Sequence, residues 1–266
     1  MTDPNEKKQK PDRRELRPIV IYAEKQKATF ILGHNEIYNV DNVKINFTAP
    51  NNISICLNIS EREYTIAKEK FLKLVQPKFK QNQQTIAFEK EETKDLYDYF
   101  EHLQVSLIFA YTAVEAFGNI AIPEHFTLEK INNKKVKEIW TKESIERWLP
   151  TTEKIKDIIP GILNVNSPKT EPFWEDFKKL EDIRNEIIHQ KTVSKEVNVS
   201  SKYLNEFFSK KIFDIIRSGY LVVNYFCSNV EFAHIYFPLD IGTMKQKPLV
   251  VDDFENYFAA IDEKEE

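Results

Sequence analysis

The sequence contains little glycine, and its five glycines form no phosphate-binding loop. The dinucleotide-binding pattern G-x-G-x-x-G and the P-loop pattern G-x-x-x-x-G-K-[ST] are both absent. The nucleophile elbow G-x-S-x-G and the zinc motif H-E-x-x-H are absent as well. The sequence therefore predicts no cofactor and no metal, which leaves either chemistry that needs neither or no chemistry at all.

Cysteine and histidine are also scarce. Cys56 and Cys227 stand far apart in apolar surroundings and match no metal-binding or redox spacing. We therefore expect buried free thiols in a reducing cytoplasm. No histidine stands at ligand spacing from another histidine or from a cysteine; the five are His34, His102, His125, His189 and His234.

Neither sign of charge dominates, since the formal net charge is -4 and the sequence pI is about 5.9. This balance excludes a strongly basic protein that coats nucleic acid, but a local basic rim remains compatible with it. Acidic residues lie among the clustered lysines, so a solvated surface of mixed charge is the alternative. The clusters are Lys134, Lys135, Lys137 and Lys142 around Trp140, and Lys178, Lys179, Lys191 and Lys195.

One apolar run, Leu103–Ile122, is long enough to be compared with a membrane span. It carries Glu115 and Asn119, which are costly in lipid, so we expect no membrane partner and a buried central helix instead. Residues 1–15 are dense in charged residues and proline and lack the apolar stretch of a signal peptide. They are predicted to form a disordered tail.

Residues 16–84 are predicted to form a small β-rich N-terminal part. Apolar residues alternate over Val43–Phe47 and again over Ile53–Ile59, and Pro50-Asn51-Asn52 between them predicts an antiparallel hairpin. Ile19–Tyr22 and Ala28–Leu32 are expected to be further strands. Ser60–Glu63 fits the capping-box pattern, so a helix is expected from there to Val75, followed by a linker to Gln84.

Residues 85–266 show helical periodicity, so the predicted fold class is mainly α, a helical bundle behind the β-rich part. A last helix near the C-terminal end, Asp252–Ile261, is expected to be short. The other expected helices are Glu91–Ile120, one from Thr141 to just before Pro150, Thr152–Ile159, Trp174–Gln190 and the aromatic-rich Ser201–Ser228.

The helix Trp174–Gln190 carries the best candidate site. Arg184, Asn185 and His189 are expected along one edge near its C-terminal end. Histidine both removes and donates protons near neutral pH, and arginine offers a planar, permanently charged fork for phosphate oxygens. Asn185 would hold the imidazole or the phosphate in register. Together these residue types suit metal-free cleavage of RNA, with charge on the phosphoryl group stabilised by Arg184.

Two simpler interpretations of the same residues stay open. A histidine near a helix C-terminus interacts favourably with the helix dipole. Arg184 also stands three residues after Glu181, so the two side chains are placed to form an ion pair on one helix face. In that case both residues would serve only the stability of the helix.

A polar stripe on the long apolar helix offers a partner for this site. Thr112, Glu115 and Asn119 fall at i, i+3 and i+7. Buried polar groups need partners, so we expect Glu115 or Asn119 to face the Arg184 turn and orient it. The alternative is that the stripe is exposed, or is satisfied elsewhere within the bundle.

R-N-x-x-x-H on a late helix, behind a long apolar helix that contains A-V-E-A-F-G-N (residues 113–119), resembles the HEPN superfamily. Many of its members are metal-independent endoribonucleases whose motif is R-x4-6-H, with a polar residue directly after the arginine; Arg184, Asn185 and His189 match that motif. The resemblance covers about Glu91 to Ser228 and implies a HEPN-like α-helical domain within residues 85–266. It also implies a homodimer with a composite active site and catalytic roles for Arg184 and His189.

Two functions follow from the resemblance. The first is an endoribonuclease that cleaves an RNA substrate by attack of the 2′-hydroxyl, as a toxin or defence effector with an antitoxin or regulatory partner. The second is a non-catalytic HEPN-like module that dimerises or binds a ligand or RNA. A further alternative gives specificity to the β-rich N-terminal part and leaves the helices as its scaffold.

Overall fold

The computed structural model of the chain describes residues 11–79, 85–131, 135–189, 202–231, 234–243 and 245–257. The chain divides into two structural units. Residues 1–54 and 227–266 form the first, which we call the strand unit, and residues 55–226 form the second, the helical unit. Helices make up most of the second unit, which confirms the mainly α-helical character predicted from the sequence.

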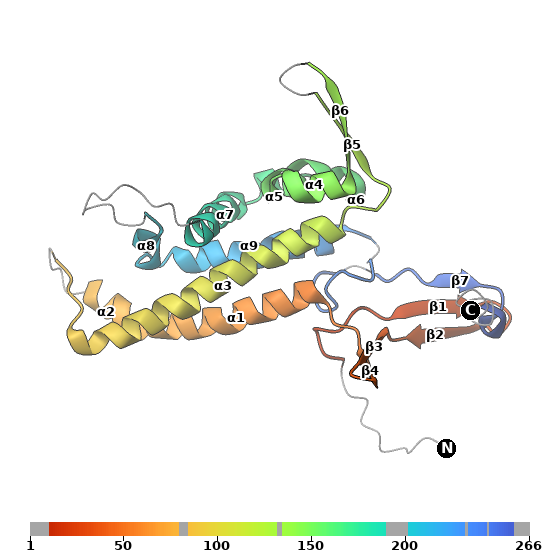
Figure 1. Cartoon of the computed structure of the whole chain (residues 1–266), viewed down its shortest axis with the longest axis horizontal. Helices are drawn as coiled ribbons and strands as arrows, with labels where there is room; N and C mark the ends of the chain where they lie inside the picture. The colour runs from red at the N-terminus through yellow and green to blue at the C-terminus, as the bar shows by residue number, and fades with distance from the viewer. Residues whose placement is uncertain are drawn as a thin grey trace. The chain divides into compact units, whose positions relative to one another are not determined.

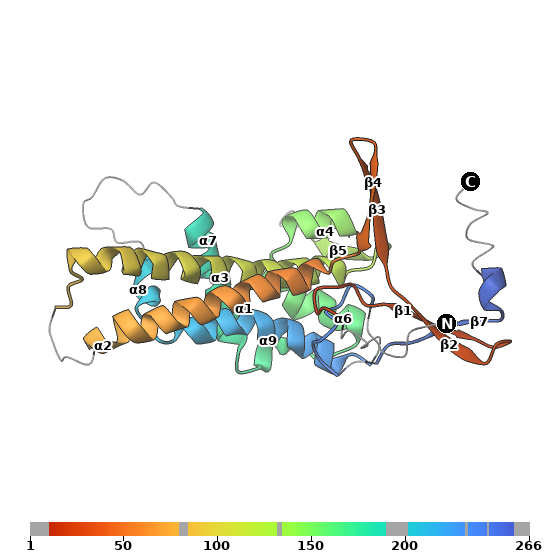
Figure 2. The same cartoon turned by 90° about the horizontal axis from the view of Figure 1, so that it is seen from below.

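Three long helices build most of the helical unit: α1 (Asn52–Lys70), α3 (Thr93–Ile120) and α9 (Ile212–Asn229) run alongside one another (Figures 1 and 2). The shorter elements are the π-helical turn Phe71–Val75, α2 (Gln76–Phe79), the 3₁₀ turn Lys90–Glu92, β5 (Thr127–Ile131), β6 (Lys137–Thr141), α4 (Lys142–Trp148), α5 (Thr151–Glu153), the π-helical turn Lys154–Ile158, α6 (Ile159–Leu163), the 3₁₀ turn Pro168–Thr170, α7 (Trp174–Ile188) and α8 (Lys202–Phe207). The expected helices near Glu91–Ile120, Thr141, Thr152–Ile159 and Trp174 are therefore confirmed.

Helices α3 and α9 approach each other closely at a glycine. A Cβ atom on Gly219 would lie 2.8 Å from the backbone oxygen of Ala110, which is closer than real Cβ contacts allow. Two turns further along both helices, the rings of Phe117 and Phe226 stack with centroids 5.4 Å apart. The missing side chain thus lets the two backbones meet while aromatic rings fill the core around them.

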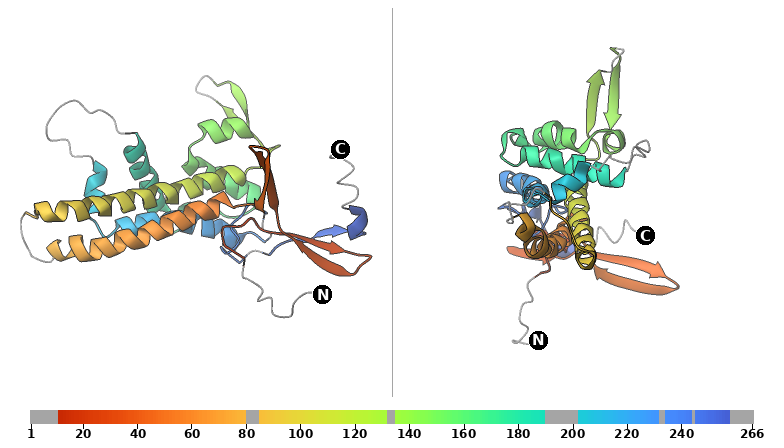
Figure 3. Two further views of the ribbon diagram at one scale, coloured as in Figure 1. Left: turned by 60° about the horizontal axis from the view of Figure 1, so that its bottom comes forward. Right: turned by 90° about the vertical axis from the view of Figure 1, so that its left-hand side faces the viewer.

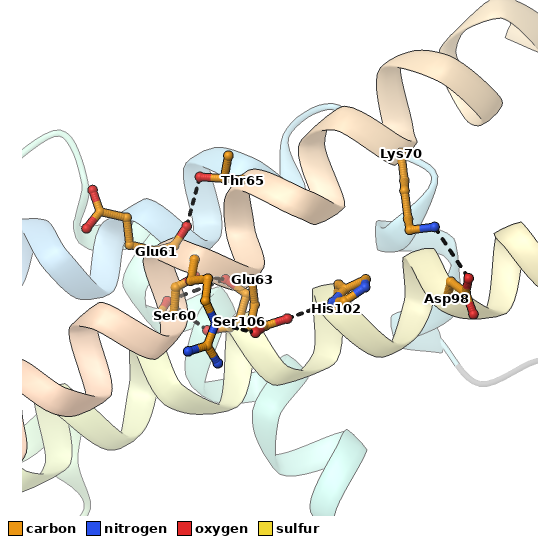
Figure 4. Close-up of polar contacts among 9 residues, drawn as sticks. Ser60, Glu61, Glu63, Thr65, Lys70, Asp98, His102 and Ser106 are labelled. Carbon is orange, nitrogen blue, oxygen red and sulfur yellow. Dashed lines mark hydrogen bonds and ion pairs between the residues drawn. The ribbon is translucent and has the colours of Figure 1, made fainter.

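Helices α1 and α3 are joined by a pair of buried serines and by a hydrogen bond between a histidine and a carboxylate (Figure 4). The Ser60 hydroxyl donates to the Ser106 carbonyl at 2.9 Å, and the Ser106 hydroxyl donates back to the Ser60 carbonyl at 2.8 Å. One turn along each helix, His102 Nδ1 lies 2.6 Å from Glu63 Oε2. The expectation that Ser60 caps a helix is wrong, because Ser60 lies in the middle of α1 and uses its hydroxyl between helices.

The expected hairpin between Val43–Phe47 and Ile53–Ile59 is also wrong, because Ile53–Ile59 is helical. Asn51 caps α1: its Oδ1 accepts the Ser54 backbone N–H at 3.0 Å. The buried residues of this segment recur at helical spacing, which outweighs the apparent two-residue alternation. They are Ile53, Cys56, Leu57, Ser60, Glu63 and Ala67.

In the strand unit, β4 (Val43–Thr48) pairs instead with β3 (Asn35–Val40), antiparallel. Asp41 and Asn42 both have positive φ, as in a type I′ hairpin turn. The register places five exposed apolar side chains on one face of this ribbon: Tyr38, Val40, Val43, Ile45 and Phe47.

A three-stranded sheet joins the two ends of the chain within the strand unit (Figure 3). The expected strands β1 (Ile19–Ala23) and β2 (Ala28–Leu32) are confirmed and pair antiparallel. On the other side of β1 lies β7 (Leu249–Val251), parallel to it, which the sequence did not predict. The buried Arg17 side chain anchors the return of the chain by donating to the carbonyl of Phe237 at 3.0 Å and to that of Pro238.

Two further expectations need correction. The single helix expected over Ser201–Ser228 is instead two helices, α8 and α9, because the chain turns between Phe207 and Ile212. At this turn the Tyr99 hydroxyl donates to the Phe207 carbonyl at 2.5 Å, which satisfies a carbonyl at the end of α8. The sequence also did not predict the β5–β6 hairpin, which projects from the helices (Figure 1).

The prediction of a disordered tail is wrong for residues 11–15, where Glu15 forms an antiparallel bridge with Pro50 and the Arg14 carbonyl accepts the Asn51 N–H. The predicted linker is wrong for Gln76–Phe79, which is helical. Residues 1–10, 80–84 and 258–261 of the expected tail, linker and C-terminal helix lie outside the described residues.

One helical stretch of the described chain, Lys90–Ile120, is long and apolar enough to cross a membrane by length and composition. Half of its most apolar window is buried inside the structure. The central helix α3 forms most of this stretch and contacts α1, α7 and α9.

Candidate functional site

Helix α7 carries the candidate motif, and its apolar face is part of the core as expected. Phe177, Leu180 and Ile183 are buried, which fixes the direction of the neighbouring polar side chains. The helix ends at Ile188, and the N–H of His189 donates to the Asn185 carbonyl at 2.9 Å in the last turn. The core contacts of α7 therefore orient the motif against α3.

Arg184 turns toward α3 and meets three groups. Its Nη2 lies 3.6 Å from Glu115 Oε2, and its Nη1 donates to Asn185 Oδ1 at 3.0 Å. The guanidinium also lies over the Tyr111 ring, 5.0 Å from the centroid. The expected approach of Glu115 to Arg184 is confirmed, and Glu115 rather than Asn119 makes it.

The Arg184 side chain is 20% exposed, so the guanidinium is partly enclosed. Its Nε is fully covered and finds no hydrogen-bond partner among the described residues. A buried donor without an acceptor costs about 1–3 kcal/mol. Part of the hydrogen-bonding capacity of Arg184 is thus left unused within one chain.

Glu181 does not pair with Arg184, so the simpler interpretation based on that ion pair is wrong. Its Oε1 accepts the Tyr111 hydroxyl at 2.6 Å, and its Oε2 accepts the hydroxyl of Thr152. Burial, with Glu181 beside it, raises the pKa of Tyr111 well above its usual value. The Tyr111 hydroxyl therefore stays protonated and acts as a donor that ties α3 to α7.

Asn119 is held by a residue that sequence reasoning missed. The buried Lys154, at the start of the π-helical turn, donates from Nζ to Asn119 Oδ1 at 2.8 Å. Burial lowers the pKa of Lys154, while Glu115 and Glu146 act in the opposite direction. A lysine among core-facing apolar residues, next to Ile155 and five before Ile159, was the signal in the sequence. Thr112, in contrast, donates to Ile108 of its own helix and does not join the cluster.

The structure does not bring the side chains of Arg184 and His189 together within one chain. Five residues on a helix correspond to about 140° around its axis, so the two side chains leave α7 in different directions. His189 is exposed, and within the described parts of the chain its imidazole makes no hydrogen bond or ion pair. Asn185 is exposed as well and contacts Arg184.

Among the described lysines of the two clusters, Lys137, Lys142, Lys178 and Lys179 form ion pairs. Lys137 pairs with Glu129 at 2.7 Å and Lys142 with Glu124 at 3.3 Å. On and beside α7, Lys178 pairs with Glu175 and Lys179 with Glu206. This pairing favours a surface of mixed charge over a basic rim. Lys134, Lys191 and Lys195 lie outside the described residues. Over the residues that are described, no group of three or more His, Cys, Asp or Glu side chains is arranged to hold a metal ion.

The candidate site is therefore a polar cluster between α3 and α7, formed by Tyr111, Glu115, Asn119, Lys154, Glu181, Arg184 and Asn185 and bordered by the exposed His189. Comparison with known proteins adds no further guide to its role. No family model, no curated protein and no solved structure matches the chain.

Proposed function

We propose that the chain is a metal-independent endoribonuclease of the HEPN type. The observation that supports this best is that Glu115 and Asn185 hold the Arg184 guanidinium one turn before an exposed histidine at the end of the same helix. Arg184 would bind the scissile phosphate, and His189 would transfer the proton. This chemistry needs no cofactor and acts on RNA in the cytoplasm.

The reaction is a transesterification. His189 accepts the proton of the ribose 2′-hydroxyl as its oxygen attacks the adjacent phosphorus. The P–O5′ bond breaks, the 5′-oxygen takes the proton back from the His189 imidazolium as it leaves, and a 2′,3′-cyclic phosphate remains. Arg184 stabilises the negative charge that develops on the phosphoryl oxygens during this exchange.

The proposal requires a second copy of the chain. Since Arg184 and His189 point in different directions in one chain, the composite site forms where two copies of α7 meet around a two-fold axis. Two Arg184/His189 pairs then line one cleft. Such a nuclease would act as a toxin or a defence effector and would be held in check by an antitoxin or another regulatory partner.

The direct test is cleavage of a single-stranded RNA in the presence of EDTA, with the product ends analysed for a 2′,3′-cyclic phosphate. His189→Ala should abolish cleavage, and His125→Ala, a change of another exposed histidine, should leave it intact. An RNA with a 2′-deoxy residue before the scissile bond should resist the wild-type protein. If wild type and His189→Ala cleave equally, the enzymatic proposal fails.

The second candidate is the non-catalytic module, and one observation favours it. Arg184 is mostly enclosed, paired with Glu115 and placed over the Tyr111 ring, which is also what helix packing alone would produce. In this case RNA or a ligand is bound but stays intact. A filter-binding measurement with intact RNA recovered afterwards supports this candidate, and cleavage that depends on His189 excludes it.

A further inference from the structure

Lys154 is the most deeply buried cation of the described chain, with 2% of its surface exposed. It begins a π-helical turn, a local irregularity that is common at functional sites. Its Nζ donates to two oxygens, Asn119 Oδ1 at 2.8 Å and the Glu146 carbonyl at 2.9 Å. Both acceptors are neutral, and within the described residues no carboxylate forms an ion pair with this amine.

A buried charge with only neutral partners is costly. If Lys154 served packing alone, an apolar side chain of similar volume would do so at lower cost. The charge therefore needs another explanation, which its surroundings offer. Asn119 stands one helical turn after Glu115 on the same face of α3, and Glu115 is the carboxylate that acts most strongly on Lys154.

We propose that Lys154 is a positioning residue for Arg184, acting through Asn119 and Glu115. Lys154 donates to Asn119 at the end of the polar stripe on α3, and Arg184 pairs with Glu115 of the same stripe. Glu115 pairs with Arg184 and also acts electrostatically on the buried charge of Lys154, although Glu115 and Lys154 form no ion pair with each other. The positive charge of Arg184 is therefore only partly neutralised within the chain, and Arg184 can still attract an anionic ligand.

This inference rests on the proposed role of Arg184, but it also predicts a property that needs no catalysis. The Nε of Arg184 is covered, so its proton should exchange slowly with water. In the full-length protein labelled with ¹⁵N-arginine, the Nε–Hε resonance of Arg184 is assigned by its loss in Arg184→Lys. Its exchange rate then reports how firmly the guanidinium is held.

The test variant is Lys154→Met, which keeps the length of the side chain and removes the charge and the donor. We expect the exchange of the Arg184 Nε proton to become about tenfold faster, since the open state is about tenfold more populated. Lys156→Met, two residues later in the same turn, is the matched control, because Lys156 pairs with Asp157 and has no contact with Asn119. It should leave the exchange rate unchanged.

Cleavage of RNA provides the second readout. Misplacement of Arg184 should lower kcat about tenfold to a hundredfold and leave KM within about twofold. Lys154→Arg, which returns a cation, should recover part of this loss. If Lys154→Met does not fold, Asn119→Ala breaks the same link while leaving the lysine in place, and the same two measurements apply.

The outcomes separate the two proposals. An exchange rate in Lys154→Met equal to that of wild type overturns the positioning role, whether or not the protein cleaves RNA. Failure of wild type to cleave RNA, with faster exchange in Lys154→Met, overturns the ribonuclease and supports the positioning role. A loss of kcat in Lys156→Met as large as in Lys154→Met also argues against the specific link.

Discussion

Glu115 and Arg184 face each other across the contact between α3 and α7, with 3.6 Å between Oε2 and Nη2. Both side chains keep some exposure, 40% for Glu115 and 20% for Arg184. An ion pair of this kind adds little to stability, about 0–1 kcal/mol. The ion pair matters because it fixes the position of the Arg184 guanidinium. We therefore expect its loss to reduce function more than it reduces the stability of the fold.

Glu115→Gln should therefore change the free energy of unfolding by no more than about 1 kcal/mol. In the same variant, RNA cleavage should fall at least about tenfold, because the amide no longer orients Arg184 by charge. Urea denaturation and initial cleavage rates measure the two effects. Glu124→Gln, at an exposed position, should change neither, and a loss of several kcal/mol in Glu115→Gln would mean that the pair is structural.

Gly219→Ala should destabilise the helical unit by about 1–3 kcal/mol, because the new Cβ would press on the Ala110 backbone. Gly161 is the matched control, since it also lies in a helix but a Cβ there meets nothing within 4 Å. Gly161→Ala should be neutral or stabilising by up to about 1 kcal/mol. Thermal unfolding followed by circular dichroism compares the two, and equal shifts in Tm would contradict the close approach.

The Glu63–His102 pair predicts a dependence of stability on acid. Burial tends to raise the pKa of Glu63, but hydrogen bonds from His102 and Arg62 outweigh it and hold the pKa below its usual 4.5. A carboxyl with a depressed folded pKa stabilises the fold above its unfolded pKa and loses this contribution as pH falls through the folded value.

Wild type should accordingly lose more stability than Glu63→Gln between pH 6 and roughly pH 3, since glutamine does not titrate. Urea denaturation at a series of pH values measures the difference. Glu69→Gln, at an exposed position of the same helix, should follow the wild-type curve. Parallel curves for wild type and Glu63→Gln would show that this carboxyl is not stabilised in the folded protein.

Asn51 predicts a cost for losing the cap of α1. It is buried, its Oδ1 accepts the Ser54 N–H, and its Nδ2 donates to the Tyr236 carbonyl at 2.8 Å. Asn51→Ala should destabilise the protein by at least about 1.5 kcal/mol, because the helix loses its cap and the Tyr236 carbonyl loses its donor. Asn52→Ala, at the exposed neighbouring position, should cost less than about 0.5 kcal/mol. Asn51→Asp keeps the acceptor and should fall between them.

Helices whose apolar residues recur clearly at helical spacing were predictable from the sequence. Segments whose apolar residues fit both the helical spacing and the two-residue spacing of a strand were not. Trp174–Ile188 shows one clear face, and its prediction was confirmed. The apolar run Ile53–Ile59 also suits a strand, but the buried residues of the segment recur at helical spacing and the helix begins at the capping bond of Asn51. That bond depends on a local geometry that a pattern of apolar residues does not contain.

The candidate site was predictable in part for a similar reason. Glu115 was found because it is a charged residue on an otherwise apolar helix, and Arg184 because it stands five residues before a histidine. Tyr111 and Lys154 were missed because their role depends on which helices meet, and their spacing in the sequence is ordinary. The pairing of Glu181 with Tyr111 likewise became visible only from the packing of α3 on α7.

The parallel pairing of β1 with β7 has a consequence for synthesis. Strand β1 is synthesised more than 200 residues before its partner Leu249–Val251. Helices α1 to α9 are made in the interval, and their contacts are mostly nearer in sequence. We expect the helical unit to acquire protection from protease on stalled nascent chains first, while β1 and β2 stay cleavable until β7 has emerged.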